Sequence, residues 1–548
     1  MATVADLIRS RHGDSNIALY NEDETWTHQQ MVELFAQRSA YILDKRVSGP
    51  FHVGILLENV PEYPMWLGAC GVSGAASVAL NPTRKGKDLE RDIRHTNCQF
   101  VISEERFRDN LNELDLGLPA DRILIIDSDS YPQALAPYKG AELPDVDIQE
   151  ADIFCMMFTS GTTGAPKACI CSQGRYGAAG IRVAASNNLG QDDTTYVAMP
   201  LYHGNSVIIG WLPTLVTGGS VVLRRKFSAS GFLPDIRKYG VTFFNYVGKP
   251  LAYILATPEL ENDADNTLKR VAGNEAAELD LYNFAKRFNC TTNDNYGSSE
   301  GCVAVMRTQE MPAGSLGRGA TESIKVLDCE TGKEKPRAVF DDNGRLINVD
   351  EAIGELVNTE GGKIFEGYWN NDEANANRIK DGIYWSGDLA YRDAEGFLYF
   401  AGRNDEWMRV DGENIAAAQV EAVLFRHPDV VLAAVYAVPD PVVGDQVMAA
   451  LQLKPGIEFD AADFIEFIAS QRDFGSKWMP ALIRISENLP VTHTVKVLKR
   501  PLRRERWQCE EPVWQRVDDN YKLMSSADKD GLLKAFNDRG RAEVLALV

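Results

Sequence analysis

Positive charge is scarce in this sequence of 548 residues. Its 57 Lys and Arg residues are outnumbered by 78 Asp and Glu residues, which leaves a formal net charge of -21 at pH 7. A net negative charge of this size argues against non-specific binding to nucleic acid or to an anionic membrane, so we expect neither as a partner. Any phosphate-bearing ligand must therefore be met by local positive charge, which makes individual Lys and Arg residues informative.

Long apolar runs, internal repeats and metal-type cysteine spacing are also missing. The first residues contain no apolar run of signal-peptide type, and the longest mostly apolar stretch, 206–223, is broken by Pro213 and by paired glycines. We therefore expect no signal peptide and no integral membrane segment. The nine cysteines are odd in number, and Cys169 with Cys171 has no second pair to complete a zinc site. Reduced thiols in the cytoplasm agree with this pattern.

The sequence does contain a regular alternation of strand and helix patterns. From residue 26 to about 300, apolar runs such as HVGILLE and IFCMMF alternate with helical patterns such as HQQMVELFAQRSAYIL. This order predicts an α/β fold, with a large N-terminal domain of parallel sheets and covering helices. Short strands between Gly, Asp and Asn turns predict a small β-rich subdomain at 314–400. A small α+β domain is expected to follow, and the tail at 516–548 is predicted to be helical.

The most informative run is FTSGTTGAPKA at 158–168. It places hydroxyl residues and glycines before a lysine: Thr159, Ser160, Gly161, Thr162, Thr163, Gly164 and Lys167. Glycines let backbone N–H groups approach phosphate oxygens, hydroxyls donate further hydrogen bonds, and lysine adds a mobile positive charge. Pro166 separates the second glycine from the lysine, so this is not a Walker A loop. We predict a mobile phosphate clamp.

This run resembles the phosphate loop of the adenylate-forming enzymes, which include acyl-CoA synthetases, the adenylation domains of peptide synthetases and luciferases. The family pattern T-S-G-T-T-G-x-P-K-G is matched through Lys167, and Ala168 stands where the last glycine is usual. The resemblance covers nearly the whole chain, from Trp26 to Lys496. It implies the use of ATP, Mg²⁺ and CoA. It also implies an AMP-binding and acyl-binding domain at 1–402, a hinge at 403–406, a mobile C-terminal lid at 407–515 and an extension at 516–548.

Two further motifs resemble the family's nucleotide site. VAGNEAA at 271–277 corresponds to the loop that borders the adenine, and in DNYGSSEG Tyr296 is expected to stack on the adenine ring. Glu300 is expected to hold Mg²⁺, a hard cation that prefers oxygen ligands. By the same resemblance, Asp388 accepts hydrogen bonds from the ribose hydroxyls and Arg403 donates to the sugar or the phosphate. The nucleotide is thus assigned Thr159, Ser160, Gly161, Thr162, Gly164, Gly273, Asn274, Glu275, Tyr296, Gly297, Ser298, Ser299, Asp388 and Arg403.

The resemblance implies two half-reactions. Lys496, in PVTHTVKVLKR, corresponds to the lysine that bridges the substrate carboxylate and the α-phosphate during adenylation. Asp405 falls at the expected hinge, and a rotation there brings Gly412 and Glu413 to the site for CoA. His203 resembles a gate beside the acyl pocket, and a satisfied core histidine is the alternative. The residues expected to act in catalysis are Lys496, Lys167, Thr163 and His203.

Within the family, the segments GNEAA, DGENIAAAQVE and KVLKR resemble fatty-acid-transport-type and actinobacterial steroid-acid or terpenoid-acid acyl-CoA synthetases. The resemblance implies an acid–thiol ligase that activates a bulky hydrophobic carboxylic acid through an acyl adenylate. The aromatic residues Phe243, Phe244 and Tyr246 wall a wide acyl pocket in this interpretation. Plain core packing is their alternative role.

Other functions stay open at this point. Ala168, Gln173, Trp407 and Val495 depart from the family pattern, and together they raise the hypothesis of a half-enzyme that only thioesterifies an adenylate supplied by a partner. Loading of a carrier protein and a luciferase-like oxygenase use the same motifs. A nucleotide sensor is disfavoured, since binding AMP alone does not require Lys496. The oligomeric state is not determined, and a homodimer is one option.

Overall fold

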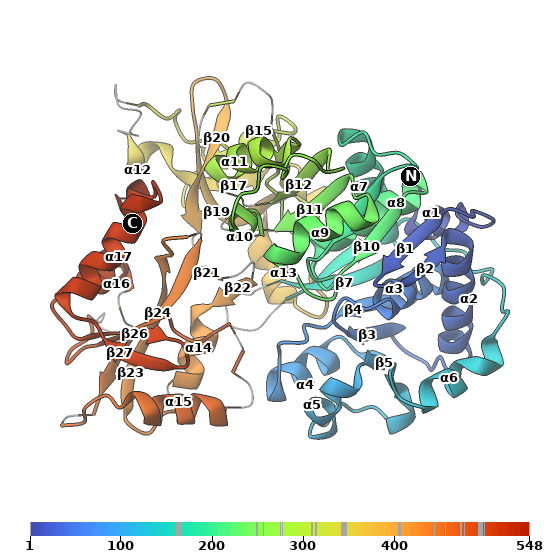
Figure 1. Ribbon diagram of the computed structural model, residues 1–548, viewed down its shortest axis with the longest axis horizontal. Coiled ribbons are helices and arrows are strands. Elements are labelled where there is room, and N and C mark those ends of the chain that lie inside the picture. The colour runs from blue at the N-terminus through green and yellow to red at the C-terminus, as the bar shows by residue number, and fades with distance from the viewer. Residues whose placement is uncertain are drawn as a thin grey trace. The chain divides into compact units, whose positions relative to one another are not determined.

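The computed structural model describes residues 2–546 except 160–166, 248–249, 256, 275, 277, 308–310, 313–314, 341–347, 404–406, 411–412, 425, 443, 455, 472–473, 476, 491–496 and 498. The chain divides into two compact units (Figure 1). The large unit takes most of the residues up to Asn404, and the small unit contains Asp405–Val548.

The first sheet of the large unit has the strand order β6-β5-β3-β4-β7-β8. Its strands are parallel except for the antiparallel pair β7–β8. Because both faces are covered, β3, β4 and β5 are buried along their whole length, as expected for parallel strands. The bounds are β3 (His52–Leu56), β4 (Ala76–Ala79), β5 (Cys98–Ser103), β6 (Ile123–Ile125), β7 (Ile153–Thr159) and β8 (Lys167–Ser172).

The second sheet has the order β13-β12-β11-β9-β10-β1-β2, and only β1–β2 is antiparallel. Parallel strands end at the same edge of a sheet, which brings the carboxyl ends of β11, β12 and β13 together. The bounds are β1 (Ile17–Asn21), β2 (Glu24–Thr27), β9 (Thr194–Val197), β10 (Ser220–Leu223), β11 (Phe243–Val247), β12 (Arg270–Asn274) and β13 (Thr291–Asp294).

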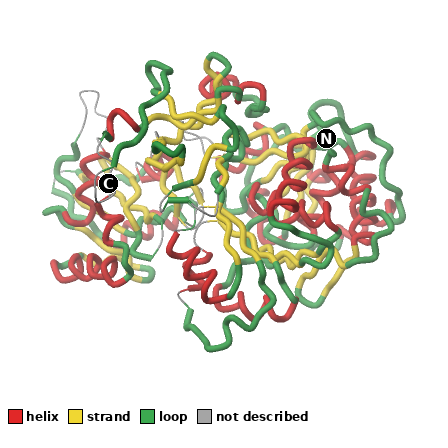
Figure 2. Tube along the Cα trace, turned by 90° about the horizontal axis from the view of Figure 1, so that it is seen from above, coloured by secondary structure: helices red, strands yellow, loops and turns green. Residues whose placement is uncertain are grey.

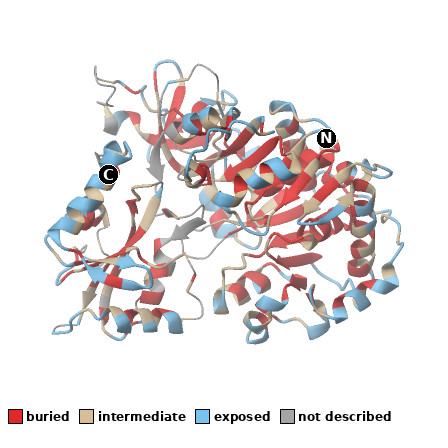
Figure 3. Ribbon diagram, viewed as in Figure 1, coloured by how far each residue is buried: buried red, intermediate tan, exposed pale blue. Residues whose placement is uncertain are grey.

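Helices cover both parallel sheets, and the buried strands stand out in Figure 3. The helices near the N-terminus lie beside strands of the large unit (Figure 2). Local sequence explains several boundaries: Thr27 and Gln30 form a capping box at the start of α2. The bounds in this unit are α1 (Val4–Arg9), α2 (His28–Asp44), α3 (Glu62–Ser73), α4 (Gly86–His95), α5 (Arg108–Asn112), α6 (Ser130–Leu135), α7 (Gln173–Ser186), α8 (Leu212–Thr217), α9 (Ala229–Tyr239), α10 (Pro250–Leu255), α11 (Glu278–Phe288), α12 (Val349–Ala352) and α13 (Asp372–Arg378).

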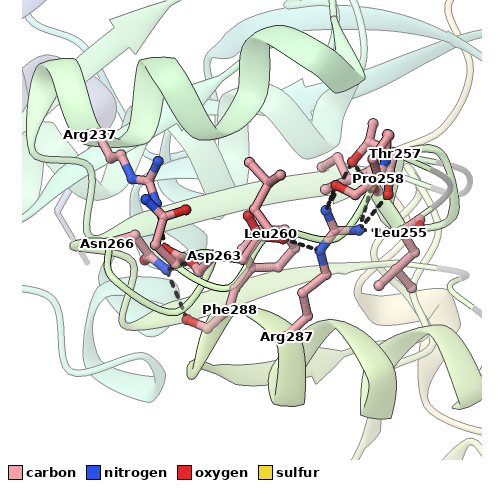
Figure 4. A network of polar contacts seen from close by, with 11 residues as sticks. Arg237, Leu255, Thr257, Pro258, Leu260, Asp263, Asn266, Arg287 and Phe288 are labelled. Atoms are coloured by element: carbon pink, nitrogen blue, oxygen red, sulfur yellow. Dashed lines mark hydrogen bonds and ion pairs between the residues drawn. The ribbon is translucent and has the colours of Figure 1, made fainter.

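An aromatic core holds two helices against the second sheet. Phe232 of α9 and Phe284 and Phe288 of α11 pack with Phe244 and Tyr246 of β11. Phe243, the third β11 aromatic that the sequence offered as a pocket wall, is fully buried in a separate small cluster with Ile209 and Ala272. All three are core residues here. The α10–α11 region is tied further by Arg287, whose guanidinium donates to several backbone carbonyls (Figure 4).

The β-rich part of the large unit is an antiparallel sheet in the order β14-β15-β20-β19-β17-β16, with β18 paired to β19. It agrees with the β-rich subdomain predicted at 314–400. The bounds are β14 (Val305–Met306), β15 (Gly317–Gly319), β16 (Ile324–Leu327), β17 (Gly354–Asn358), β18 (Ile379–Lys380), β19 (Ile383–Arg392) and β20 (Phe397–Arg403).

The small unit contains the pair β21–β22 and a mixed sheet in the order β23-β24-β25-β26-β27. Its strands are β21 (Trp407–Val410), β22 (Glu413–Ala416), β23 (Val430–Pro439), β24 (Asp445–Leu453), β25 (Leu482–Ile485), β26 (Val513–Val517) and β27 (Asn520–Leu523). Its helices are α14 (Ala417–Leu424), α15 (Ala461–Ser470), α16 (Lys499–Glu505) and α17 (Ser526–Asp538).

The prediction that 516–548 is helical is wrong at its start. Val513–Val517 and Asn520–Leu523 form an antiparallel hairpin, and β26 also pairs with β25, so this part of the tail belongs to the sheet of the small unit. The turn is made by Asp518, whose φ of 53° lies in the left-handed region that Asp tolerates. Only the later part is helical, chiefly in α17.

Candidate active site

The predicted phosphate loop connects two neighbouring antiparallel strands. Thr159 is the last residue of β7 and Lys167 the first of β8, and the two face each other across the strand pair. The Thr159 hydroxyl donates to the Lys167 carbonyl at 3.5 Å. The ends of the loop are thus held together by a hairpin. Five of its predicted phosphate ligands lie outside the described residues: Ser160, Gly161, Thr162, Thr163 and Gly164.

Tyr368 connects the lysine of this loop to the predicted metal ligand. The Nζ of Lys167 lies 5.3 Å from the centre of the Tyr368 ring, within the range of a cation–π contact. The Tyr368 hydroxyl donates to Oε1 of Glu300 at 2.6 Å and accepts from Nε of Arg378 at 3.1 Å. Burial, together with the neighbouring Glu300 carboxylate, raises the pKa of Tyr368 far above its ordinary value, so its hydroxyl stays a donor.

Arg175 fixes the backbone on either side of this contact. From α7, its Nη1 donates to the carbonyls of Ser299 and Glu300 at 3.0 and 2.6 Å, and its Nη2 donates to the carbonyl of Ile170 at 2.7 Å. Gly301 follows with a φ of +66°, and a Cβ there would lie 2.8 Å from Nη1 of Arg175. The chain therefore needs glycine directly after Glu300.

The Glu300 carboxylate suits a bound cation. Glu300 is 6% exposed, its Oε1 accepts from a neutral hydroxyl, and it forms no ion pair with a Lys or Arg side chain among the described residues. A buried carboxylate is stable when a cation balances its charge. Carboxylate oxygens are the ligands that Mg²⁺ prefers, so Glu300 fits a bound Mg²⁺.

The predicted adenine loop is built on the ends of β11, β12 and β13. Gly273 packs against Tyr246, whose carbonyl oxygen would lie 2.2 Å from a Cβ at position 273. The Tyr246 hydroxyl donates to Oδ1 of Asp294, which also accepts from the backbone N–H of Ala276 at 3.1 Å. Asp294 thus ties the segment after Gly273 and Asn274 to the end of β13.

The predicted adenine and ribose ligands meet in the structure. The Tyr296 hydroxyl donates to Oδ2 of Asp388, which is 5% exposed. Asp388 stands opposite Arg403 in the register of the β19–β20 pair. Between Tyr296 and Glu300, a side chain at Gly297 would face open space, and the buried Ser298 hydroxyl has no hydrogen-bond partner among the described residues. This stretch therefore offers a ligand open space at Gly297 and a hydroxyl at Ser298 that can form a hydrogen bond with it.

His203 is half-buried, and its ring centre lies 4.5 Å from that of Tyr202. Its backbone N–H donates to the Pro200 carbonyl at 3.1 Å. Two residues later, the Asn205 amide donates to Oδ1 of Asn274 at 2.7 Å, so the segment that carries His203 contacts the end of β12.

The remaining predicted site residues are not placed as side chains. Glu275, Asp405, Gly412 and Lys496 lie outside the described residues. For Arg403 and Glu413 the structure gives only the strand, β20 and β22 respectively. The hinge, the CoA contacts and the lysine of adenylation thus stay predictions.

Comparison with known proteins bears on this arrangement. A family model described as AMP-binding enzyme matches residues 9–369, and the AMP-binding enzyme C-terminal domain matches 419–496. The chain belongs to the AMP-binding enzyme family. The resemblance to adenylate-forming acyl-CoA synthetases seen in the sequence is confirmed, and with it the use of ATP or AMP and of CoA.

Two relatives in this family are similar over most of their length. The steroid-22-oyl-CoA synthetase of Rhodococcus jostii is 46% identical over 548 residues, or 99% of each chain. A medium/long-chain-fatty-acid–CoA ligase of Mycobacterium marinum is 47% identical over 465 residues, covering 85% of this chain and 88% of that protein.

Solved structures of the family share the fold. The o-succinylbenzoate CoA synthetase of Bacillus subtilis, bound with a product analogue, has a TM-score of 0.75 at 22% identity and covers 91% of this chain and 98% of its own. The amide bond synthetase McbA of Marinactinospora thermotolerans has the same score and identity, covering 91% and 99%. The predicted α/β architecture is confirmed. Among the described helices, none is both long enough and apolar enough to cross a membrane.

Several residues of the family site were missed in the sequence. Tyr368, Arg378 and Arg175 carry no motif that points to Glu300, and each is recognised only by its contact there. Asp294 is the first residue of the quoted motif DNYGSSEG, and its position at the end of a strand was an available signal.

Gly273→Ala is expected to raise the KM for ATP about tenfold or more. The added Cβ meets the Tyr246 carbonyl at 2.2 Å, so β12 must shift, and a shift of about 1 Å at a reacting site costs up to ~100-fold in rate. ATP-dependent exchange kinetics measure the effect. Gly190→Ala is the matched control, because a Cβ there meets nothing within 4 Å. An unchanged KM for ATP in Gly273→Ala would show that the close approach of Gly273 to the Tyr246 carbonyl does not affect the use of ATP.

Asp294→Asn is expected to stabilise the protein at pH 7 to 8 by about 1–3 kcal/mol. Burial raises the pKa of Asp294 to about 6, against the opposing effect of its hydrogen bonds from Tyr246 and Ala276 and of Arg307. Between the ordinary pKa of aspartate and pH 6, the folded state keeps a proton that the unfolded state has lost. The folded state therefore loses stability as the pH rises through this window. Above pH 6 the whole loss that comes from burying the ionised Asp294 remains.

Asparagine accepts the same two hydrogen bonds without a charge. The difference in the free energy of unfolding between variant and parent should therefore become smaller as the pH falls from 8 toward 5. Urea unfolding of both proteins across that range measures it. A variant that is less stable than the parent at pH 8 would mean that the pairing with Arg307, 3.9 Å away, outweighs burial.

Proposed function

We propose that this protein is an AMP-forming acyl-CoA ligase that activates bulky hydrophobic carboxylic acids, with steroid acids as its main substrates and long-chain acids as secondary ones. The single observation that carries this is the 46% identity to a steroid-22-oyl-CoA synthetase over 99% of both chains. The site supports use of a nucleotide, because Lys167, Tyr368 and Glu300 form a buried charged cluster and the Tyr296 hydroxyl donates to Asp388 in the same unit.

The nucleotide is held by groups from several elements in this proposal. The phosphate clamp at 159–167 surrounds the phosphates, with Thr163 and Lys167 nearest to the transferred group. The Tyr296 ring stacks on the adenine, and Asp388 exchanges its bond from Tyr296 for bonds from the ribose hydroxyls. Gly273 and Asn274 border the adenine, with Glu275 beside them. Arg403 adds a donor to the same sugar or phosphate.

Glu300 would hold Mg²⁺ on the phosphates, with Tyr368 orienting its carboxylate. When bound, the ion neutralises phosphate charge. Ligands are oriented by partners that hydrogen-bond to them, which is the part that Tyr368 takes, together with Arg378.

The first half-reaction joins the acid to AMP. A carboxylate oxygen attacks the α-phosphorus, the bond to the β-phosphate breaks, and pyrophosphate leaves with the electron pair. In this proposal Lys496 bridges the carboxylate and the α-phosphate and stabilises the charge that develops there. His203 forms the gate at the acid side.

The second half-reaction uses the small unit in a different orientation. The hinge at 403–406, centred on Asp405, rotates the lid at 407–515 so that Gly412 and Glu413 line the path of the CoA pantetheine. The CoA sulfur attacks the acyl carbonyl carbon, its proton is lost to solvent, and AMP leaves. No cysteine of the chain is needed as a nucleophile.

The test separates the two half-reactions. The purified protein is given fatty, steroid and diterpenoid acids, and acid-dependent ATP–pyrophosphate exchange is followed. In parallel, synthetic acyl adenylates and CoA are supplied, and the thioester is detected by mass. Exchange together with thioester, fastest with steroid acids, is the expected result. Thioester without exchange for every acid would establish the half-enzyme, and failure of both would reject the ligase.

We further place the enzyme in the cytoplasm, where its nine free thiols stay reduced. A single chain carries both half-reactions in this proposal, so no adenylating partner is required. Loading of a carrier protein is not favoured, since the two relatives are named a CoA synthetase and a CoA ligase. Sedimentation of the purified protein distinguishes a monomer from the homodimer.

A further inference from the structure

A row of asparagine amides runs from the middle of β11 to the carboxyl ends of β12 and β13. Asn245 Nδ2 donates to Asn205 Oδ1 at 2.9 Å, and Asn205 Nδ2 donates to Asn274 Oδ1 at 2.7 Å. Asn274 Nδ2 then donates to the backbone carbonyl of Asn295. A backbone carbonyl can only accept, so it sets the direction of all three amides. We call these four residues the asparagine ladder.

The ladder joins two segments that the proposed function assigns to different substrates. Asn274 ends β12 beside Gly273, and Asn295 directly precedes Tyr296, so one end lies at the nucleotide. Asn205 follows His203 by two residues, so the middle of the ladder lies at the acid side.

The backbone around Asn205 is unusual. Residues Ser206–Trp211, directly after it, form a π-helix, a wider turn that is frequent at functional sites. Asn205 Nδ2 also contacts the carbonyl of Tyr246 at 3.3 Å, which anchors the start of this helix to β11. The segment that carries His203 and Asn205 is therefore tied to both β11 and β12.

The far end of the ladder is buried in apolar surroundings. Asn245 is fully buried, and its Oδ1 has no hydrogen-bond partner among the described residues. Ile209 and Phe243 form the apolar cluster beside it. A Cβ at Gly210 would lie 3.2 Å from Asn245 Oδ1, so the π-helix packs closely on the ladder. Water does not readily replace hydrogen bonds between buried amides. The hydrogen bonds of the ladder are therefore kept when one of its segments moves, and the neighbouring segment moves with it.

We propose that Asn205 is a positioning residue that couples binding of the acid to binding of the nucleotide through its hydrogen bond to Asn274. The inference rests on the proposed function. A bound acid displaces the segment that carries His203, Asn205 follows, and the end of β12 is moved relative to the adenine. The coupling is reciprocal, since a nucleotide that changes the affinity for the acid has its own affinity changed by the same factor.

The test measures dissociation constants by isothermal titration. The nucleotide probe is α,β-methylene-ATP, which cannot be attacked with loss of pyrophosphate, titrated with and without saturating dodecanoic acid or a C-22 steroid carboxylic acid. In the parent protein the acid is expected to change the nucleotide affinity by about fivefold or more. Asn205→Ala and Asn274→Ala should each bring this factor to within about twofold of one. The double variant should show no further change, because both remove the same hydrogen bond.

Two more variants separate coupling from a loss of folding. Asn266→Ala is the matched control, since Asn266 is another half-buried amide that donates to two carbonyls, those of Asp263 and Phe288 (Figure 4). It should lower the melting temperature about as much as Asn205→Ala while keeping the parental factor. Asn205→Asp keeps the acceptor for Asn245 and sets an oxygen against Asn274 Oδ1, so it should bind the nucleotide more weakly than Asn205→Ala.

The inference is overturned if the parent shows no coupling, if Asn205→Ala keeps the parental factor, or if Asn266→Ala loses it as well. These outcomes are distinct from failure of the proposed function, which shows as absence of turnover with every acid in the parent protein. Binding is measured without turnover, so the coupling is decided either way.

Discussion

Glu300→Gln is expected to lower kcat for acid-dependent ATP–pyrophosphate exchange by about 10²–10³-fold. Glutamine keeps the shape of the side chain, and its Oε1 can still accept from Tyr368, which now donates at 2.6 Å. The loss is therefore confined to the negative charge that would bind Mg²⁺. The concentration of Mg²⁺ needed for half-maximal rate should rise with it, which is measured by titrating the metal at saturating ATP.

Tyr368→Phe is the control for this experiment. It removes the hydroxyl between Glu300 and Arg378 and keeps the ring that faces Lys167. Partners that orient a metal ligand typically contribute about 10–100-fold, so its loss should be smaller than that of Glu300→Gln. A Glu300→Gln protein with the parental rate and metal requirement would exclude Glu300 as the metal ligand.

Arg287→Ala is expected to destabilise the large unit by about 3–5 kcal/mol. Nε of Arg287 pairs with Oδ2 of Asp263 at 2.7 Å, and the two side chains are only 7% and 3% exposed. The other guanidinium nitrogens donate to the carbonyls of Ile254, Leu255, Thr257 and Pro258 and to the Thr257 hydroxyl (Figure 4). Alanine leaves a buried carboxylate without its cation and these acceptors without a donor.

Arg237→Ala is the comparison for urea unfolding of this variant. Arg237 is drawn in the same network and also donates to backbone carbonyls, those of Asn262 and Asp265, but its contacts are exposed to solvent (Figure 4). Its loss should cost about 1 kcal/mol or less, since water replaces the lost donor. Equal losses for the two variants would show that burial of the Arg287–Asp263 pair adds nothing.

Much of the fold followed from local patterns. Apolar runs such as 52–56 and 153–159 are strands, and amphipathic stretches such as 28–44 are helices, because burial on one face or on both imposes a period that the sequence displays. The hairpin at 513–523 was missed although its turn residues were visible. Its strands are only partly buried, so the alternation of apolar and polar residues is weak.

The site was predictable where its residues are consecutive. The run at 158–168, the adenine loop and the segment at 294–301 identify the family by themselves, because backbone N–H groups, hydroxyls and one carboxylate must follow one another to surround a nucleotide. The contacts among these motifs were not predictable. Tyr368 reaches Glu300 from 68 residues away, and Asn205 reaches Asn274 from 69 residues away.

The sequence by itself determined the family, and it determined the alternation of strands and helices in the large unit, although it missed the hairpin at 513–523 in the small unit. Each of these depends on residues that are close along the chain and is therefore written in local spacing. The tertiary structure decided that Tyr368 contacts both Lys167 and Glu300, that Tyr296 donates to Asp388, and that the asparagine ladder connects the segment of His203 to the end of β12. These contacts arise from how the sheets and their covering helices pack, and packing depends on the shapes of side chains that no local pattern records.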